Sequence, residues 1–512
     1  MNKPQHVIAI DQGTTSTRAI VFDASARATA IERRALTQHY GDAGRVEHDA
    51  EEIWRDTETT VREVIARCPG GAAGVAALGI TNQRETVVVW ERASGTPIHP
   101  AIVWQDRRTA QECARLKAEG TEDLIRRKTG LLLDPYFSAT KIGWILDQVP
   151  GARARAERGQ LAFGTIDSFL LWRLTGGRVH ATDITNASRT MLYDIHVQSW
   201  DEELLRLLRV PRALLPEVRD SSEVYGTTSL FGRALPIAGI AGDQQAALIG
   251  QACFRPGMAK STYGTGCFLL LNTGDVAVTS ANRLLTTPAY RIGGRIAYAL
   301  EGSIFVAGAA IKWLRDGLKV IESASQTAAL AARLPYDHGV YLVPAFVGLG
   351  APHWEPDARG LLCGLSFEAS AAHLARAALE AVAYQTLDLT LAMQRDGAQP
   401  LAALRIDGGM AANEWLCQFL ADILQARVER PAELETTALG AALLAGLATG
   451  MWPGLDALSS IWSPEAVYEP RMNRAQRAAL IEGWQQALSR TLQAAGSRSA
   501  PLAEAERPGR HD

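Results

Sequence analysis

"IAIDQGTTSTRAIVFD", residues 8–23, sets two apolar runs on either side of a polar centre. The flanking runs have the Val, Ile and Ala content of paired β-strands. The centre holds one carboxylate, one glycine and four hydroxyl side chains: Asp11, Gly13, Thr14, Thr15, Ser16 and Thr17. Polar groups are costly to bury unless they have partners, so this hairpin tip indicates a binding role.

A second stretch, "STYGTGCFLLL" at 261–271, repeats the form of strand, glycine-hydroxyl turn and strand. Two such hairpins predict two similar halves that meet at a cleft, although they can also be unrelated turns. We place the domain boundary after residue 252, which gives a first domain at 1–252 and a second at 253–495. The remaining segment, 496–512, lacks periodicity and is expected to be disordered.

The composition of the chain favours a globular α/β protein. Its 512 residues are 47% hydrophobic and 21% charged, with a net charge of -3, which gives no reason to expect nucleic-acid binding. The six cysteines are scattered and are interpreted as buried small residues in a reducing compartment. No leader or apolar run long enough to span a membrane is found in the sequence, so a cytoplasmic protein is expected.

Strand and helix patterns alternate along the chain, as in α/β proteins. Periodicity predicts helices over 50–68, 109–119, 244–253, 371–394, 413–427 and 473–494. Strands are predicted over 75–80, 86–90, 340–343 and 404–406.

A Gly/Thr-rich hairpin tip offers backbone N–H groups and hydroxyls to an anion such as a phosphate chain. Gly13, and in the second hairpin Gly264 or Gly266, permit a positive φ and close approach by a ligand. Asp11 would repel phosphate directly, so a cation, normally Mg²⁺ through its water shell, is expected between them. The alternative is an Asx-type turn that only caps the hairpin. Neither G-x-x-x-x-G-K-[ST] nor G-x-G-x-x-G occurs, which favours a hairpin-based nucleotide cleft of the actin and hexokinase type.

Two further segments complete a candidate nucleotide and acceptor site. "LRIDGGMAANEWLCQFLADIL" at 404–424 places Gly409 and Asn413 between a strand and a helix, as an adenosine pocket or an ordinary turn. "GIAGDQQAALIGQ" at 239–251 puts Asp243 at a helix start, as a general base for a hydroxyl or as an N-cap.

Polar and aromatic residues elsewhere in the first half are candidates for the acceptor pocket. "GITNQRETVVVW" offers Arg84 and Glu85, which can fork around polyol hydroxyls or form an exposed salt bridge. "AIVWQDRR" and "LDPYFSATKIGWIL" add Trp104, Tyr136 and Lys141; the alternative for the two aromatic residues is a place in the core.

Over residues 5–490 the chain resembles the FGGY family of carbohydrate kinases, and within it the members that phosphorylate glycerol. The shared motifs are "AIDQGTTS", "GITNQRET", "DPYFSATKIGWIL", "TNASRTML", "GIAGDQQAAL", "STYGTGCF" and "GLGAPHWEPDARG". The resemblance implies two actin-like (ribonuclease H-like) α/β domains with a deep interdomain cleft, ATP and Mg²⁺ as cofactors, and sn-glycerol 3-phosphate as product. It also implies a homodimer or homotetramer with no nucleic-acid or membrane partner.

The resemblance assigns roles residue by residue. Glycerol contacts fall on Arg84, Glu85, Trp104, Tyr136, Asp243, Gln244 and Phe268, with Asp243 as the general base. Nucleotide contacts fall on Thr14, Thr15, Ser16, Arg18, Thr265, Gly308, Gly409 and Asn413, and Asp11 is expected to hold Mg²⁺ through water.

Two positions depart from the family pattern. Lys312 stands one helical turn after Gly308, where members often carry Gln, and we expect it to contact the nucleotide. The loop "GTTSLFGRALP" at 226–236 is short and apolar where fructose bisphosphate-regulated members are rich in Gly, Lys and Arg.

Two other functions are the rival interpretations of this sequence. One is a kinase of the same fold for a pentulose or other sugar, and the other is an actin-like binding or regulatory protein without turnover.

Overall fold

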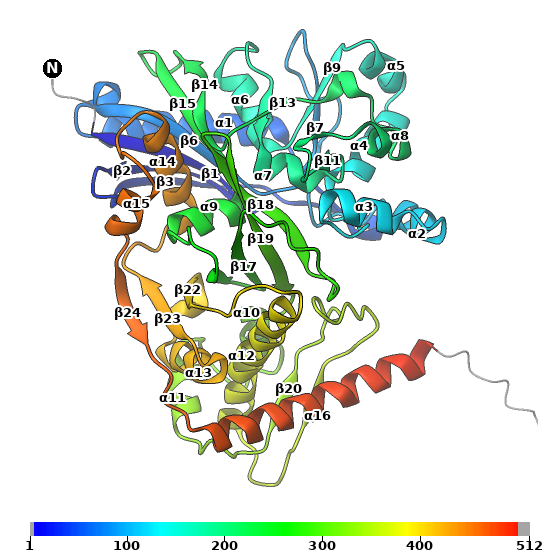
Figure 1. Cartoon of the computed structure of the whole chain (residues 1–512), viewed down its shortest axis with the longest axis vertical. Helices are drawn as coiled ribbons and strands as arrows, with labels where there is room; N and C mark the ends of the chain where they lie inside the picture. Colours follow the sequence, from blue (N-terminus) through cyan, green and yellow to red (C-terminus); the bar gives the residue numbers. More distant parts are fainter. Residues whose placement is uncertain (1–4, 500–512) are drawn as a thin grey trace, which may run out of the picture.

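The computed structural model describes residues 5–499, which form two large sheets, five small ones of two or three strands, and helices around them (Figure 1). The first sheet has the order β14-β15-β6-β1-β2-β3. Its strands are β1 (His6–Gln12), β2 (Ser16–Asp23), β3 (Ala28–Ala35), β6 (Val75–Asn82), β14 (Ser222–Thr228) and β15 (Leu235–Gly242). The second has the order β18-β19-β17-β16-β22-β23-β24. Its strands are β16 (Met258–Tyr263), β17 (Cys267–Gly274), β18 (Leu285–Ile292), β19 (Arg295–Ile304), β22 (Ala403–Asp407), β23 (Arg427–Pro431) and β24 (Pro464–Tyr468).

The two sheets repeat one strand arrangement. In each sheet, the second strand of a β-hairpin pairs with an antiparallel strand, β3 in the first sheet and β19 in the second. The first strand of the hairpin pairs in parallel with another strand, β6 or β22. That strand in turn pairs in parallel with β15 or β23. The hairpins are β1–β2 and β16–β17, which are the two stretches singled out in the sequence. The expectation of two similar α/β halves is therefore confirmed.

Helices and short strands complete the chain. The helices are α1 (Ala50–Arg67), α2 (Ala110–Ala118), α3 (Glu122–Thr129), α4 (Ser138–Gln148), α5 (Ala152–Glu157), α6 (Ile166–Leu174), α7 (Ile184–Ala187), α8 (Glu202–Leu207), α9 (Asp243–Gly250), α10 (Gly308–Lys312), α11 (Gln326–Ala332), α12 (Ala371–Arg395), α13 (Glu414–Leu424), α14 (Thr436–Ala448), α15 (Leu455–Ile461) and α16 (Arg474–Ser499). The short strands include β7 (Val88–Glu91), β9 (Leu161–Gly164) and β20 (Tyr341–Val343). Within the described residues, no helix combines the length and apolar character needed to cross a bilayer.

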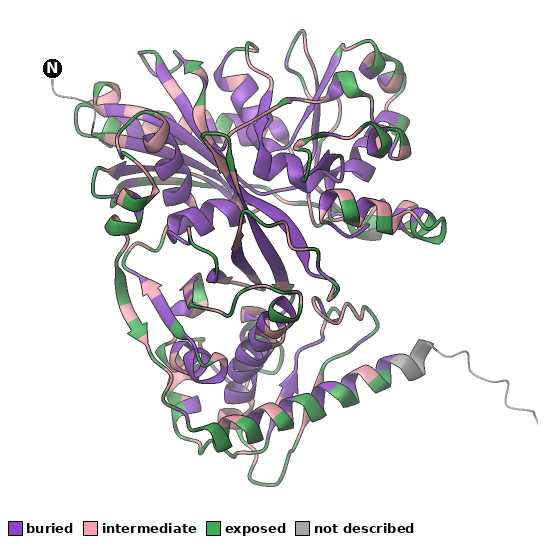
Figure 2. Ribbon diagram, in the orientation of Figure 1, coloured by how far each residue is buried: buried purple, intermediate pink, exposed green. Residues whose placement is uncertain are grey.

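Alternate residues of the first sheet enter two different cores, because successive side chains of a strand point to opposite faces. Ile8 and Ile10 join a buried cluster with α1 and α6. Val7 and Ala9 join another with α9 and α14. Figure 2 shows the central strands β1, β2, β6 and β15 buried along most of their length, whereas the edge strands β3 and β14 are partly exposed.

Helix α14 follows β23 of the second sheet, yet it packs on α9 and on β1, β6 and β15 of the first. Glycine allows this contact to be made by backbone. A Cβ on Gly440 would lie 1.8 Å from the carbonyl oxygen of Ala246 in α9. A Cβ on Gly79 would lie 2.2 Å from the carbonyl oxygen of Ala441. The proposed boundary at residue 252 thus separates the two sheets but does not separate their cores.

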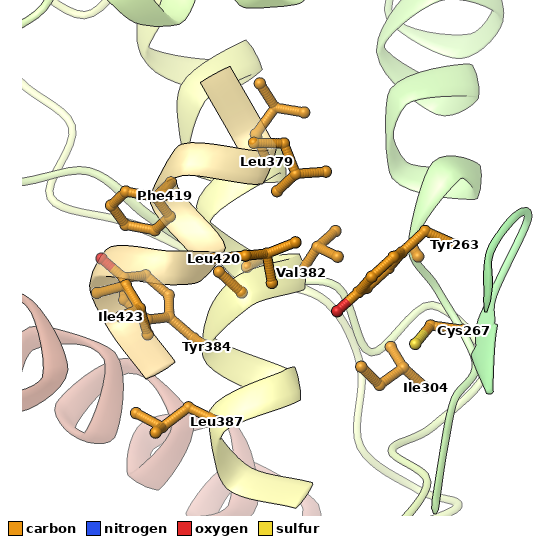
Figure 3. Close-up of a cluster of buried hydrophobic side chains, with 14 of the residues drawn as sticks. Tyr263, Cys267, Ile304, Leu379, Val382, Tyr384, Leu387, Phe419, Leu420 and Ile423 are labelled. Carbon is orange, nitrogen blue, oxygen red and sulfur yellow. The ribbon is translucent and has the colours of Figure 1, made fainter. Parts of the chain in front are cut away.

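The second half has its own core beneath the second hairpin. Figure 3 shows Tyr263 of β16 pointing toward Val382 of α12, with Leu420 of α13 beyond. The buried Tyr263 hydroxyl hydrogen bonds with Thr386 of α12 at 3.1 Å. This packing fixes the strand that leads into the hairpin tip.

Most predicted elements are confirmed, with differences at their ends. The helix predicted over 413–427 ends at Leu424, because Gln425 has a φ of 52° and β23 begins at Arg427. The last helix continues to Ser499, so the first four residues of the expected disordered tail are helical, and 500–512 lie outside the described residues. All six cysteines are free, and five are buried while Cys363 is partly exposed.

Candidate active site

The first hairpin carries a chain of ion pairs next to its turn. Asp11 and Arg18 face each other in the β1–β2 register, and an Arg18 Nη2 to Asp11 Oδ2 salt bridge joins them. Arg18 Nη1 also pairs with Glu435 Oε2 at 2.5 Å, just before α14. Burial raises the pKa of Asp11, against the lowering effect of Arg18, and the charges of Glu435 and Asp243 raise it further. Carboxylates from both halves therefore gather beside the hairpin.

The hairpin tip itself joins two groups that were predicted separately. Thr14 Oγ1 accepts a hydrogen bond from Trp104 Nε1 at 2.9 Å. Thr15 is exposed at the tip, whereas the Ser16 carbonyl closes the turn by accepting from Gly13 N–H at 2.9 Å. A candidate phosphate-binding residue thus contacts a candidate acceptor-binding residue. Gly13, Gly264 and Gly266 lack a positive φ. Gly266 is needed for space instead, since a Cβ there would lie 2.5 Å from the carbonyl oxygen of Ile304.

Arg84 and Glu85 are both buried, so the alternative of an exposed salt bridge is wrong. Arg84 donates through Nη1 and Nη2 to the two oxygens of Glu301 at 2.6 and 3.1 Å, and its Nε lies 3.1 Å from Asp243 Oδ1. Glu85 has a φ of 62°, a strained conformation for a residue with a side chain. Its carbonyl accepts from Ser138 Oγ at 3.1 Å, and its carboxylate accepts from Arg189 Nε at 2.6 Å.

Asp243 is the first residue of α9, after the extended Gly242. It does not cap the helix in the N-cap position; its Oδ1 accepts from the N–H of Gln244 at 2.7 Å. Its side chain keeps 31% of its surface exposed, while Arg84 beside it is 2% exposed. A carboxylate held on one edge by a guanidinium and open on the other is placed to take a proton from a bound hydroxyl.

Lys260 of β16 fixes the side chain of Gln244, the residue that follows Asp243. Its buried Nζ donates to Gln244 Oε1 and, at 3.2 Å, to Thr262 Oγ1. Burial lowers the pKa of Lys260, although Asp407 and Asp243 raise it. Because an ammonium group only donates, the Gln244 oxygen must face Lys260 and its NH₂ group is left to other partners.

Trp104 and Tyr136 form an edge-to-face pair with ring centroids 5.5 Å apart, and both are half-buried. They border the core without being part of it, which disfavours the purely structural alternative. The buried Lys141 donates to the Tyr136 carbonyl at 2.6 Å, and burial lowers its pKa to about 8. Lys141 therefore supports the backbone of Tyr136. Phe268 is half-buried on β17, and its contact with the acceptor remains a prediction.

The second hairpin tip meets the start of α10. Gly308 N–H donates to the Gly264 carbonyl at 3.0 Å, and a Cβ on Gly308 would lie 2.6 Å from that oxygen. Thr265 is exposed at the tip. Lys312 ends α10 with an exposed side chain, and a π-helical turn (Trp313–Gly317) follows. That turn changes the helical phase, and Leu318, which follows it, is 43% exposed.

The two candidates for the adenosine pocket, Gly409 and Asn413, differ in how much of their surroundings is left open to a ligand. A Cβ on Gly409 would have nothing within 4 Å, so space lies beside it. Asn413 instead caps α13, where its Oδ1 accepts from Leu416 N–H at 3.1 Å and its Nδ2 donates to Thr327 Oγ1 at 3.0 Å. Both amide atoms are already bonded, the oxygen as a helix cap, for which Asn is well suited, and the nitrogen to Thr327.

Sequence reasoning missed four charged residues of the site: Glu301, Arg189, Lys260 and Glu435. A charge within an otherwise buried strand was the available signal for Glu301 and Lys260, since such residues are rarely buried unless paired.

Comparison with known proteins gives a consistent result. Models of the FGGY family of carbohydrate kinases match the N-terminal domain at residues 6–250 and the C-terminal domain at 259–449. A glycerol kinase of Gluconobacter oxydans is 63% identical over 98% of this chain and 98% of its own. A glycerol kinase of Rhodospirillum centenum is 60% identical over 95% and 98%. The crystal structure of Plasmodium falciparum glycerol kinase with ADP has a TM-score of 0.91, with 36% identity over 95% of this chain and 98% of that one.

Proposed function

The chain belongs to the FGGY family of carbohydrate kinases, and on this premise we propose that it transfers the γ-phosphoryl group of ATP to a terminal hydroxyl of glycerol, giving sn-glycerol 3-phosphate. Identity of 57–63% to glycerol kinases over nearly the whole chain supports this activity. The structural observation that carries it is Asp243, partly exposed at the start of α9 and 3.1 Å from Arg84.

Glycerol is held in this proposal by charged and aromatic groups. Arg84, Glu85 and Asp243 bond the hydroxyls. The remaining contacts are Trp104, Tyr136, Gln244 and Phe268, of which Trp104 and Phe268 border the carbon chain. The edge-to-face pair of Trp104 and Tyr136 supports such a wall.

The nucleotide is proposed to lie along both hairpins. The proposed contacts are Thr14, Thr15, Ser16, Arg18, Thr265, Gly308, Lys312, Gly409 and Asn413. Asp11 lies near two further carboxylates, the hard oxygen ligands that suit Mg²⁺. Among the described residues, no group of three or more side chains could hold a metal by itself. Asp11 would hold Mg²⁺ through water, and the ion would neutralise phosphate charge.

The reaction is an in-line displacement in this proposal. The glycerol oxygen forms a bond to the γ-phosphorus while the bond from that phosphorus to ADP breaks. Asp243 takes the hydroxyl proton, and Arg18 with the hairpin N–H groups stabilises charge on the transferring group.

A coupled assay of ADP release with a panel of polyols and pentuloses tests the proposed function. Turnover that requires glycerol is expected. Faster turnover of a pentulose would favour a sugar kinase of the same fold, and no turnover with any acceptor would favour a binding protein. A homodimer or homotetramer remains a prediction from the family resemblance, and a cytoplasmic location remains a prediction from the sequence.

The Lys312→Gln variant is expected to change the KM for ATP by about 2- to 10-fold, on the order of one hydrogen bond. The reason is that Lys312 lies one turn beyond Gly308, and its ammonium can only donate. Steady-state kinetics should show an unchanged KM for glycerol. Lys117→Gln, another lysine on the surface, is the control. Unchanged ATP kinetics would place Lys312 on the solvated face only.

Fructose bisphosphate is expected to inhibit weakly or not at all. Two phosphate groups need several cationic donors, and the segment 226–236 has a single arginine. Arg233 already donates to the carbonyls of Ala72 and Ala73 at 3.4 and 3.3 Å. Titration of the sugar into the activity assay, with inorganic phosphate as the control for ionic strength, measures this. Strong inhibition at sub-millimolar concentration would contradict it.

A further inference from the structure

Glu301 is a buried carboxylate of the second sheet that binds two arginines of the first half. It lies on β19, and its residue is 1% exposed. Its Oε2 accepts from Arg84 Nη1 at 2.6 Å, and its Oε1 accepts from Arg84 Nη2 at 3.1 Å and from Arg189 Nη2 at 3.0 Å. Both oxygens are thus bonded to guanidinium groups, so Glu301 can act on a substrate only through those groups.

Arg189 extends this network to Glu85, the other charged residue proposed with Arg84 to bind the polyol. Its Nε donates to Glu85 Oε1 at 2.6 Å, and its guanidinium lies over the Phe137 ring at 5.2 Å. Arg189 has no exposed surface. Arg84 and Glu85, the two groups proposed to bind glycerol hydroxyls, are therefore both held by contacts that converge on Glu301.

The geometry also determines which edge of Arg84 meets Asp243. Glu301 occupies both terminal nitrogens, and Asp243 contacts only Nε, at 3.1 Å. Bidentate contact with a carboxylate is the stronger arrangement for a guanidinium. Without Glu301, the terminal nitrogens would keep only the Nη1 contact to Gln245 Oε1 at 3.2 Å. They could then turn toward Asp243, which would take Arg84 from the hydroxyls and occupy the proposed base.

We propose that Glu301 is a positioning residue of the acceptor site: from the second half of the chain it holds Arg84 directly and Glu85 through Arg189. The inference rests on the proposed function and adds to it. Because β19 belongs to the second sheet, the shape of the glycerol pocket depends on how the two halves sit together. Removing one partner of such a buried pair leaves the others with uncompensated charge.

The Glu301→Gln variant tests this, since it keeps the size of the side chain and removes its charge. The KM for glycerol is expected to rise by about 10- to 100-fold, with the KM for ATP within about twofold of the wild-type value. Isothermal calorimetry should show the same weakening of glycerol binding without ATP. A merely structural role would lower thermal stability and the fraction of active enzyme but leave the KM for glycerol unchanged.

Glu380→Gln is the matched control, because Glu380 is a buried carboxylate that pairs with Arg376 Nε at 2.7 Å on α12. It should lower thermal stability without changing the KM for glycerol. If Glu301→Gln does not fold, Arg189→Lys keeps the charge but loses the planar contact to both carboxylates, and should also raise that KM. An unchanged KM for glycerol in the variant that folds would overturn this inference but not the proposed function. Failure of the wild-type enzyme to phosphorylate glycerol would overturn the proposed function, and the inference with it.

Discussion

The Asp243→Asn variant is expected to lose kcat by about 10²- to 10⁴-fold, which is the usual contribution of a general base. An amide has nearly the same size, and its oxygen can still accept from Arg84 Nε and from the N–H of Gln244. It cannot take the proton of the attacking hydroxyl. Steady-state kinetics with ATP in excess measure the loss, and calorimetry should show glycerol binding largely intact.

Asp201→Asn separates this effect from that of changing any helix-start aspartate. Asp201 caps α8, where its Oδ1 accepts from Glu203 and Leu204 N–H at 3.0 and 2.9 Å. Asn is an equally good cap, so this control should leave kcat unchanged. A loss of less than tenfold in Asp243→Asn would mean that another group takes the proton.

Gly440→Ala is expected to destabilise the protein by about 3 kcal/mol, the upper end of the usual cost of overpacking. The new methyl group would lie 1.8 Å from the carbonyl oxygen of Ala246, so α14 and α9 must separate. Alanine is intrinsically better than glycine within a helix by about 1 kcal/mol, so propensity alone predicts the opposite sign.

Thermal unfolding followed by circular dichroism measures this loss. Gly454→Ala is the control, because a Cβ on Gly454 would meet nothing within 4 Å and its φ of 170° suits any residue. An unchanged or higher midpoint for Gly440→Ala would show that the two helices adjust without cost.

The sequence predicts the hairpins well because their signals are local. Alternating apolar residues around a glycine-hydroxyl turn determine both strands and the turn, and the register Asp11↔Arg18 follows from the short connection. Asp243 is equally local, since Gly242 and the helix start place it. The motifs around Arg84 and Asp243 were sufficient to find them, although not to show that they touch.

The partners of these residues could not be predicted, because they come from distant strands. Glu301 is 217 positions from Arg84, and Glu435 is 417 from Arg18. Only the pairing of the folded halves brings them together. The end of the helix predicted over 413–427 was wrong for a different reason. Gln, Ala and Arg at 425–427 favour a helix, but the pairing of Arg427 with Ala403 in the sheet overrides that preference.

The place of α14 has a consequence for biosynthesis. A nascent chain that has emerged only as far as residue 252 contains all six strands of the first sheet. One face of β1, β6 and β15 is still without α14, which lies near the other end of the chain. That apolar face stays open to water or to a chaperone until residues 436–448 leave the ribosome. The two halves must therefore mature together, and a fragment cut at 252 would expose the surface that α14 covers.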